Sequence, residues 1–147
     1  MSKAKISVLA ILFLLISGCP ALAAESVFII GNGTYSINGE IRKDTAPYIK
    51  NGRTYLPLRY AAYAAGIGDN SIYWDGTTKT AYMTKKGEIL SVRVGERVII
   101  SGNRIIVTDA PAELMGGRVM LPLRAIAEAF GCQVEWDAEQ QKAIVKE

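Results

Sequence analysis

The sequence predicts an α+β fold of two tandem repeats, each a small antiparallel β-sheet wrapped around one short helix. The first observation behind this prediction is a frame of Ala-Pro, Gly-Arg and Leu-Pro-Leu-Arg that occurs twice, ending at Arg59 and again at Arg124. The second is that Asn-Gly and Gly-Asn pairs separate short β-rich runs, which is typical of tight hairpins. A period of about 60 residues suits a duplicated small domain better than a short solenoid repeat.

The composition narrows the function classes. The chain has 147 residues, of which 50% are hydrophobic and 21% charged, as in a globular protein. The lack of histidine excludes Ser-His-Asp and Cys-His nucleophiles and His-ligated zinc or copper. Asp and Asn residues lack the dense spacing of a calcium loop. We therefore expect no enzyme activity, no metal site and no cofactor, and we expect Cys132 to be a small buried side chain without a disulfide.

The first 24 residues have the features of a secretory signal peptide. Lys3 and Lys5 supply the positive start, residues 6–16 are apolar, and Ala21-Leu22-Ala23 is a small-x-small cleavage site. The apolar run of about 11 residues is well short of the roughly 20 that span a bilayer as a helix, and no other stretch is long enough. The expectation is an exported chain without a transmembrane segment.

A second processing route starts from the same segment. Ile16-Ser17-Gly18-Cys19 resembles the lipobox of bacterial lipoproteins, in which the cysteine carries a lipid anchor and becomes the first residue. Pro20 and the later small-x-small site favour ordinary secretion, and both routes stay open. Both place the mature chain outside the cytoplasm, secreted or associated with the cell envelope. Loss of Lys3 and Lys5 lowers the formal charge from +3 to about +1, which is too little for nucleic-acid binding.

Two helices, each of about ten residues, follow the opening hairpins. Pro57 and Pro122 fit the first turn of these helices, and Gly66 and Gly131 fit their left-handed stops. Apolar residues spaced by three and four give each helix one apolar stripe. The predicted inner faces are Leu58, Ala61, Ala62 and Ala65 in the first helix and Leu123, Ile126, Ala127 and Phe130 in the second.

A strand hairpin is expected after each helix, at residues 72–84 and 134–146, where apolar and polar residues alternate around a turn. The repeats then span residues 25–86 and 87–147. Because about 60 residues bury only a modest core, we expect the two repeats to pack together or to share strands rather than fold independently.

The repeated segments resemble a known family. Gly-Arg-Thr-Tyr-Leu-Pro-Leu-Arg at 52–59 and Gly-Arg-Val-Met-Leu-Pro-Leu-Arg at 117–124 are each followed by an Ala-rich helix, a glycine and Trp-Asp. This pattern resembles the copper amine oxidase N-terminal-like domain, also called the stalk domain, over nearly all of the mature chain and in two copies. The resemblance implies a five-stranded antiparallel sheet around a helix, a secreted or wall-associated location and no inherited oxidase chemistry, since such a domain is a non-catalytic appendage. The missing histidines independently exclude the family enzyme's copper site.

Two arginines are predicted to form structural ion pairs. Arg59 and Arg124 lie at helix starts, where a cation opposes the helix dipole by a few tenths of a kcal/mol to about 1 kcal/mol. Asp75 and Asp137, which follow the two tryptophans, are the expected partners and would tie each helix start to the next hairpin. The alternative is a functional anion site, with Arg59 and Arg53 in one copy and Arg124 and Arg118 in the other.

All seven tyrosines lie in the first repeat. Tyr60 and Tyr63 are three residues apart and point away from the apolar stripe of the helix, and Tyr73 lies on the following strand. Exposed tyrosines form rigid amphipathic contact area, so these three are the candidate ligand-binding residues, stacking on sugar rings or anchoring a protein. Burial of the rings against the second repeat is an alternative of at least equal weight. The aligned residues of that repeat, which we expect at its surface, are Ala125, Glu128 and Glu135.

A carboxylate cluster follows the second helix at Glu135, Asp137 and Glu139. Glycosidases need two carboxylates at a controlled separation, with one in an apolar pocket. The first repeat has Tyr73 where the second has Glu135, so we interpret the cluster as a solvated strand edge and assign no catalytic residue.

The sequence therefore predicts an exported, non-enzymatic binding or structural spacer module at the bacterial cell envelope, with a protein or a wall polysaccharide as partner. One alternative is a small hydrolase of wall polymers that works with carboxylates alone, and another is an accessory or inhibitor subunit of a secreted enzyme. A hydrolase needs a concave pocket with two close carboxylates, whereas a binding module offers an open tyrosine-rich face.

Overall fold

The computed structural model describes residues 24–147, so the predicted signal segment, with the candidate lipidation residue Cys19, lies outside the described residues apart from Ala24. Residues 25–86 form the first half, with β1 (Glu25–Ile29), β2 (Thr34–Ile37), β3 (Glu40–Lys43), β4 (Tyr48–Lys50), β5 (Arg53–Pro57), α1 (Leu58–Ala64), the 3-10 helix η1 (Asp69–Ser71), β6 (Ile72–Asp75) and β7 (Thr80–Lys85). Residues 87–147 form the second half, with β8 (Glu88–Arg93), β9 (Val98–Ser101), β10 (Arg104–Val107), β11 (Glu113–Met115), β12 (Arg118–Pro122), α2 (Leu123–Phe130), β13 (Gln133–Asp137) and β14 (Lys142–Lys146).

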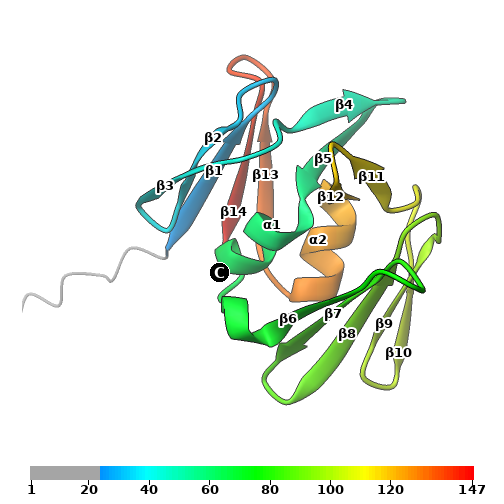
Figure 1. Cartoon of the computed structure of the whole chain (residues 1–147). Helices are drawn as coiled ribbons and strands as arrows, with labels where there is room; N and C mark the ends of the chain where they lie inside the picture. The colour runs from blue at the N-terminus through cyan, green and yellow to red at the C-terminus, as the bar shows by residue number, and fades with distance from the viewer. Residues whose placement is uncertain (1–23) are drawn as a thin grey trace, which may run out of the picture.

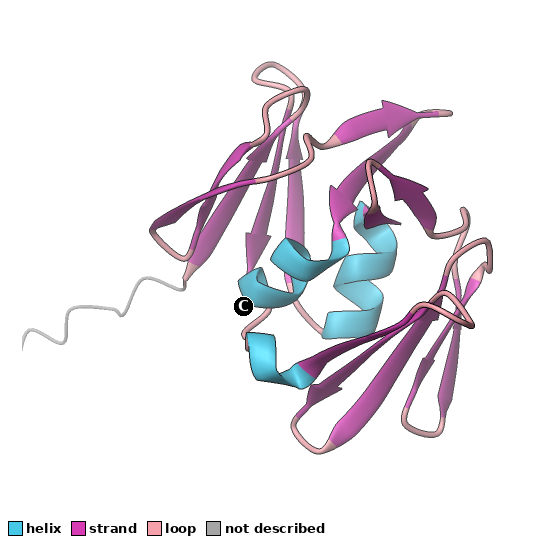
Figure 2. Cartoon of the chain, viewed as in Figure 1, coloured by secondary structure: helices cyan, strands magenta, loops and turns pink. Residues whose placement is uncertain are grey.

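The strands form three antiparallel sheets, which confirms the α+β class. The N-terminal sheet has the order β13-β14-β1-β2-β3, the middle sheet has the order β10-β9-β8-β7-β6, and the small sheet has the order β11-β12-β5-β4. Figures 1 and 2 show the two helices lying between the two five-stranded sheets, with the small sheet at one end of the helices. The core therefore lies around the helices.

Each sheet combines strands of both halves. β14 pairs with β1, β7 pairs with β8 and β12 pairs with β5. The expectation that the halves share strands is confirmed, whereas neither half wraps a sheet of its own around its helix. Exchange of strands covers edges that a unit of this size would leave open, which explains the arrangement physically.

The helices begin and end close to the predicted signals. Pro57 and Pro122 are the N-cap residues, one position before the first turn in which we expected them. The C-cap of α1 is Ala65, which is followed by Gly66 at φ 79°, and the C-cap of α2 is Gly131 at φ 65°. Glycine adopts this left-handed conformation without a Cβ penalty, so both helices stop here.

The two helices differ in how well their buried faces were predicted. The stripe of α1 is buried as expected, and it lies in the same core cluster as Phe28 and Leu90 from the two five-stranded sheets. On α2, Leu123 and Ala127 are only partly buried, because the helix packs against β5, β12 and β13 through a neighbouring face. That face consists of Ala125, Ile126, Ala129 and Phe130.

Cys132 follows α2 and is buried and free, as expected. Burial raises the pKa of its thiol, which keeps the sulfur protonated at neutral pH. Its Sγ donates to the carbonyl of Ile126 over 3.8 Å, so the residue fills the core beside the end of the helix.

Candidate functional site

A first groove lies at the start of α1. The helix start, the edge strand β6 and the hairpin of β11 and β12 enclose a volume of about 390 Å³. Its lining includes two arginines and three aromatic residues, namely Arg59, Arg118, Tyr60, Tyr73 and Trp74. Because Arg118 comes from the second half and the others from the first, the groove depends on the crossing of the two halves.

A second groove of about 430 Å³ has the same construction at the start of α2. It lies between that helix start, the edge strand β13 and the hairpin of β4 and β5. The two linings correspond residue by residue: Trp136 matches Trp74, Arg124 matches Arg59, and Arg53 matches Arg118. The lining of the second groove also includes Asp109, and it has no tyrosine.

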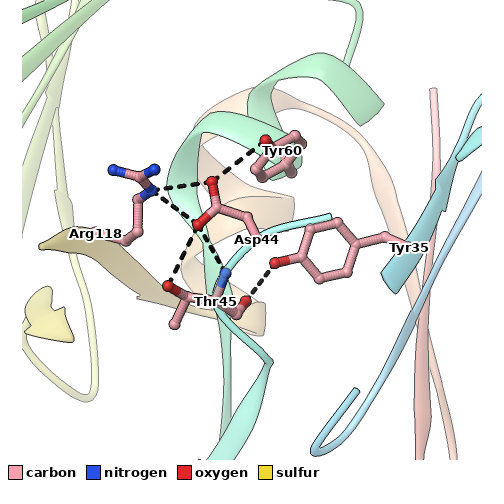
Figure 3. A network of polar contacts seen from close by, with 5 residues as sticks. All are labelled: Tyr35, Asp44, Thr45, Tyr60 and Arg118. Carbon is pink, nitrogen blue, oxygen red and sulfur yellow. Dashed lines mark hydrogen bonds and ion pairs between the residues drawn. The ribbon is translucent and has the colours of Figure 1, made fainter. Parts of the chain in front are cut away.

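A partly buried aspartate fixes the hairpin that borders the first groove (Figure 3). Arg118 donates through Nε to Oδ1 and Oδ2 of Asp44 over 2.8 Å and 2.9 Å. The hydroxyl of Tyr60 donates to Oδ2 over 3.3 Å, and the backbone N–H of Thr45 donates to Oδ1 over 2.7 Å. Burial alone would raise the pKa of Asp44, but these hydrogen bonds and the Arg118 charge hold it below its usual value. Asp44 is therefore a carboxylate that joins the two halves.

The second groove has a counterpart of this contact. Arg53 donates through Nε to Oδ2 of Asp109 over 2.9 Å, and this hydrogen bond lowers the pKa of Asp109. Arg53 belongs to the first half and Asp109 to the second, so this contact also crosses between the halves. The two hairpins of the small sheet are thus each fixed by an arginine to an aspartate of the other half.

Tyr60 and Tyr63 do not form an open face. Both rings are half-buried and pack against the core. The Tyr60 ring lies 5.1 Å from that of Tyr35 and 5.6 Å from that of Tyr63, between ring centroids. The aromatic rings beside them belong to the first half, whereas their helix also packs against β12 and β14 of the second half. The prediction that Tyr60 is exposed relied on its counterpart Ala125 lying at the surface, but Ala125 is buried.

Tyr73 is the candidate ligand-binding residue that the structure leaves open. Its side chain is exposed, and it lies beside Tyr82 with the ring centroids 6.3 Å apart. Tyr73 lies on the edge strand β6, next to Trp74, and both line the first groove.

The predicted ion pairs differ from those that form. Arg59 pairs with Asp69 over 2.5 Å rather than with Asp75, and the hydroxyl of Tyr63 donates to the same Asp69 oxygen over 2.7 Å. Asp75 instead accepts hydrogen bonds from the N–H groups of Thr77 and Thr78 in its own turn. A short aspartate side chain readily bonds the backbone two or three residues ahead, which explains the correction.

The second predicted pair, Arg124 with Asp137, is also absent within residues 24–147. Asp137 accepts from the N–H of Gln140 over 3.0 Å, as Asp75 does in its own turn. Asp69 belongs to the extra residues of the first half, so α2 has no equivalent partner for Arg124.

The structure also regroups the arginines of the alternative anion site. Arg59 lines the first groove with Arg118, and Arg124 lines the second groove with Arg53. Each groove thus combines one arginine from each half. The sequence alone suggested pairs within one half because it does not show that the hairpins cross.

The carboxylates of the hydrolase alternative lie away from both grooves. Glu135 accepts from Lys146 over 3.0 Å on an exposed face of the N-terminal sheet. Glu139 is exposed in the following turn, and neither residue lines a groove. The part of the chain that the structure describes has no group of three or more Cys, Asp or Glu residues that could hold a metal.

A family model for the copper amine oxidase N-terminal domain matches residues 32–145, from the turn before β2 to β14. The chain belongs to the copper amine oxidase N-terminal domain family. The N-terminal domain of this family is non-catalytic in itself. Comparison with curated proteins and with solved structures gave no match. Within residues 24–147 of this family member, neither helix is long and apolar enough to cross a membrane.

Asp44 and Asp69 are the structural residues that sequence reasoning missed. Asp44 precedes Thr-Ala-Pro and Asp109 precedes Ala-Pro, so an acidic residue just before each Ala-Pro was the available signal. No comparable signal marks Asp69, whose role depends on the position of η1 beside α1.

Proposed function

We propose that this family member is an exported, non-enzymatic binding module of the bacterial cell envelope, built from two tandem copies at residues 25–86 and 87–147, which binds an anionic wall polysaccharide in the first groove. The lining of that groove carries the proposal. Trp74 offers aromatic surface on which sugar rings stack. Arg59 and Arg118 each pair with an aspartate through one nitrogen and keep their other guanidinium N–H groups for acidic substituents.

The duplication is supported by matched contacts in the two halves. Both halves run through five strands, one α-helix and two strands. The N–H of Asp44 donates to the carbonyl of Gly33 over 2.8 Å, and at the equivalent positions the N–H of Thr108 donates to that of Arg97 over 2.8 Å. Export is supported by the positive start, apolar run and small-x-small site of the first 24 residues, with Cys19 as the alternative lipid anchor.

The groove lining favours binding over the hydrolase alternative. A glycosidase places two carboxylates on either side of its substrate. The described residues that line the first groove include two arginines and no carboxylate, and Asp44 beside it is already occupied by Arg118, Tyr60 and Thr45. The guanidinium N–H groups that are not used on Asp44 and Asp69 remain to donate to acidic groups of a polymer, and no acid or base is aimed into the groove.

The test compares the two grooves by co-sedimentation with isolated cell-wall polymer. Trp74→Ala removes a stacking surface from the first groove, and Trp136→Ala makes the matched change in the second. Loss of one aromatic partner costs about 0.5–1.5 kcal/mol, so we expect the affinity of Trp74→Ala to fall about two- to tenfold. Trp136→Ala should bind like the wild type. Equal loss in both variants, or a wild type that does not sediment with the polymer, would contradict the proposal.

A further inference from the structure

The outer face of the middle sheet is apolar and uncovered in the described structure. Its register aligns Tyr73, Tyr82, Ser91, Ile100 and Ile105 in one row across all five strands. Ile89 and Val107 lie beside this row, and Ile105 and Val107 are 71% and 72% exposed. We call this surface the apolar face, made of Tyr73, Tyr82, Ile89, Ile100, Ile105 and Val107.

The equivalent face of the N-terminal sheet shows that this apolar surface is not required by the fold. There the row consists of Glu135, Ile144, Val27, Ser36 and Ile41. Lys146 lies 3.0 Å from Glu135 and 4.0 Å from Glu25, between N and O atoms, so an ion network keeps this face hydrated.

In the middle sheet, the matching positions of that network have lost their charges. Tyr73 replaces Glu135, Thr84 replaces Lys146 and Ile89 replaces Glu25. Exposed apolar patches of this size on a small protein mark interaction sites.

We propose that two copies of this chain pack their apolar faces against each other as a β-sandwich dimer. Six exposed apolar side chains offer on the order of several hundred Å² per copy, comparable to the roughly 800 Å² that each partner buries in a standard stable interface. Two sheets of the same twist pack face to face at a spacing of about 10 Å. A two-fold axis makes the same patch serve on both sides, so no second complementary surface is needed.

The chemistry of the face favours a second copy over other partners. Four of its six side chains are aliphatic, and sugar rings stack on aromatic rings rather than on isoleucine or valine. Asp75 and Arg93 lie at one end of this face, where each pairs with Thr80 across neighbouring strands, and Glu88 and Glu96 border it. An apolar centre with a polar rim is the usual anatomy of an interface between identical chains.

The first test is the mass of the purified protein by sedimentation equilibrium from low to high micromolar concentration. We expect a dimer for the wild type and a twofold lower mass for Ile105→Lys, because a buried ammonium group has no partner in the apolar interface. Ile41→Lys is the matched control, since Ile41 has the same place on the N-terminal sheet and is 65% exposed. It should remain dimeric, and circular dichroism should show that both variants are folded.

A second measurement locates the axis. Ser91 lies in the centre of the row on the central strand β8, so a two-fold axis through the face brings the two Ser91 residues close together. Mild oxidation should therefore link Ser91→Cys into a disulfide dimer, while Val27→Cys on the central strand of the other sheet should stay unlinked. Cys132 is buried and does not compete.

Three results would overturn the dimer. They are a monomeric wild type at all concentrations, an Ile105→Lys variant that remains dimeric, and disulfide linking of Val27→Cys in place of Ser91→Cys. These variants leave Trp74, Arg59 and Arg118 unchanged, so the outcome is independent of polysaccharide binding in the first groove.

Discussion

The two hairpins of the small sheet are fixed by the same contact in different surroundings. Arg118 and Arg53 each donate through Nε to an aspartate of the other half, over 2.8 Å and 2.9 Å. The side chain of Asp44 is 13% exposed and that of Asp109 is 36% exposed. Asp44 also accepts from Tyr60 and Thr45. The comparison teaches that the same kind of ion pair can contribute differently to stability. Solvent screens the more exposed pair, whereas the less exposed acceptor has several donors that depend on it.

The largest expected effect is the loss of stability on removal of the partly buried Asp44 carboxylate. Asp44→Ala leaves the Thr45 N–H and the Tyr60 hydroxyl without their acceptor and frees Arg118. We expect the free energy of unfolding to fall by about 2 kcal/mol. Asp109→Ala removes a solvent-screened pair and should cost less than about 1 kcal/mol. Denaturant unfolding of both variants measures the difference.

Equal losses in the two aspartate variants would show that burial does not distinguish the two contacts. A double variant that also replaces Arg118 sharpens the result. If Arg118 contributes mainly through Asp44, then Arg118→Ala in the Asp44→Ala background should cost much less than in the wild type.

The close approach of Gly33 to the backbone of Asp44 predicts a smaller loss of stability on substitution. A Cβ at Gly33 would lie 2.3 Å from the backbone oxygen of Asp44, which is far too close, and the Asp44 N–H donates to the Gly33 carbonyl over 2.8 Å. Gly33→Ala must therefore shift the chain at Asp44 and should lower the free energy of unfolding by about 1–2 kcal/mol. Gly68→Ala, where nothing lies within 4 Å of the added Cβ, is the control and should unfold like the wild type. A neutral Gly33→Ala would mean that the loop at Asp44 yields easily.

Local chemistry explains what the sequence predicted well. The ends of both helices depend on proline and glycine, whose backbone restrictions act at one position, so Pro57, Gly66 and Gly131 were assigned to within about one residue. The strand hairpins and the shared strands follow from alternation and from the small size of each half.

Contacts across the halves explain what the sequence did not predict. Arg118 and Asp44 are 74 positions apart, and no local pattern reports that the hairpin of one half reaches the other. Tyr60 was assigned to the surface because the alignment places it opposite Ala125, which was expected to be exposed. Ala125 is instead buried in α2, where its small side chain fits the core. Asp75 and Asp137 were assigned to arginines because charge is visible in the sequence, whereas the competing backbone donors of their own turns are not.

The smallest expected effect distinguishes the two contacts by their pH dependence. The pKa of Asp44 lies below its usual value in the folded chain, so its stabilising contribution is present above the unfolded pKa near 3.9 and is lost as the pH falls through the lower folded pKa. The stability gap between the wild type and Asp44→Asn should therefore stay constant from about pH 7 to about pH 5 and narrow below about pH 4. The pKa of Asp109 is lowered by its hydrogen bond from Arg53, so Asp109→Asn should show the same sign with a smaller gap, because this pair is screened by solvent. Urea unfolding at a series of pH values measures both gaps, and a gap for Asp44→Asn that widens on acidification would show that Asp44 is not stabilised as the carboxylate.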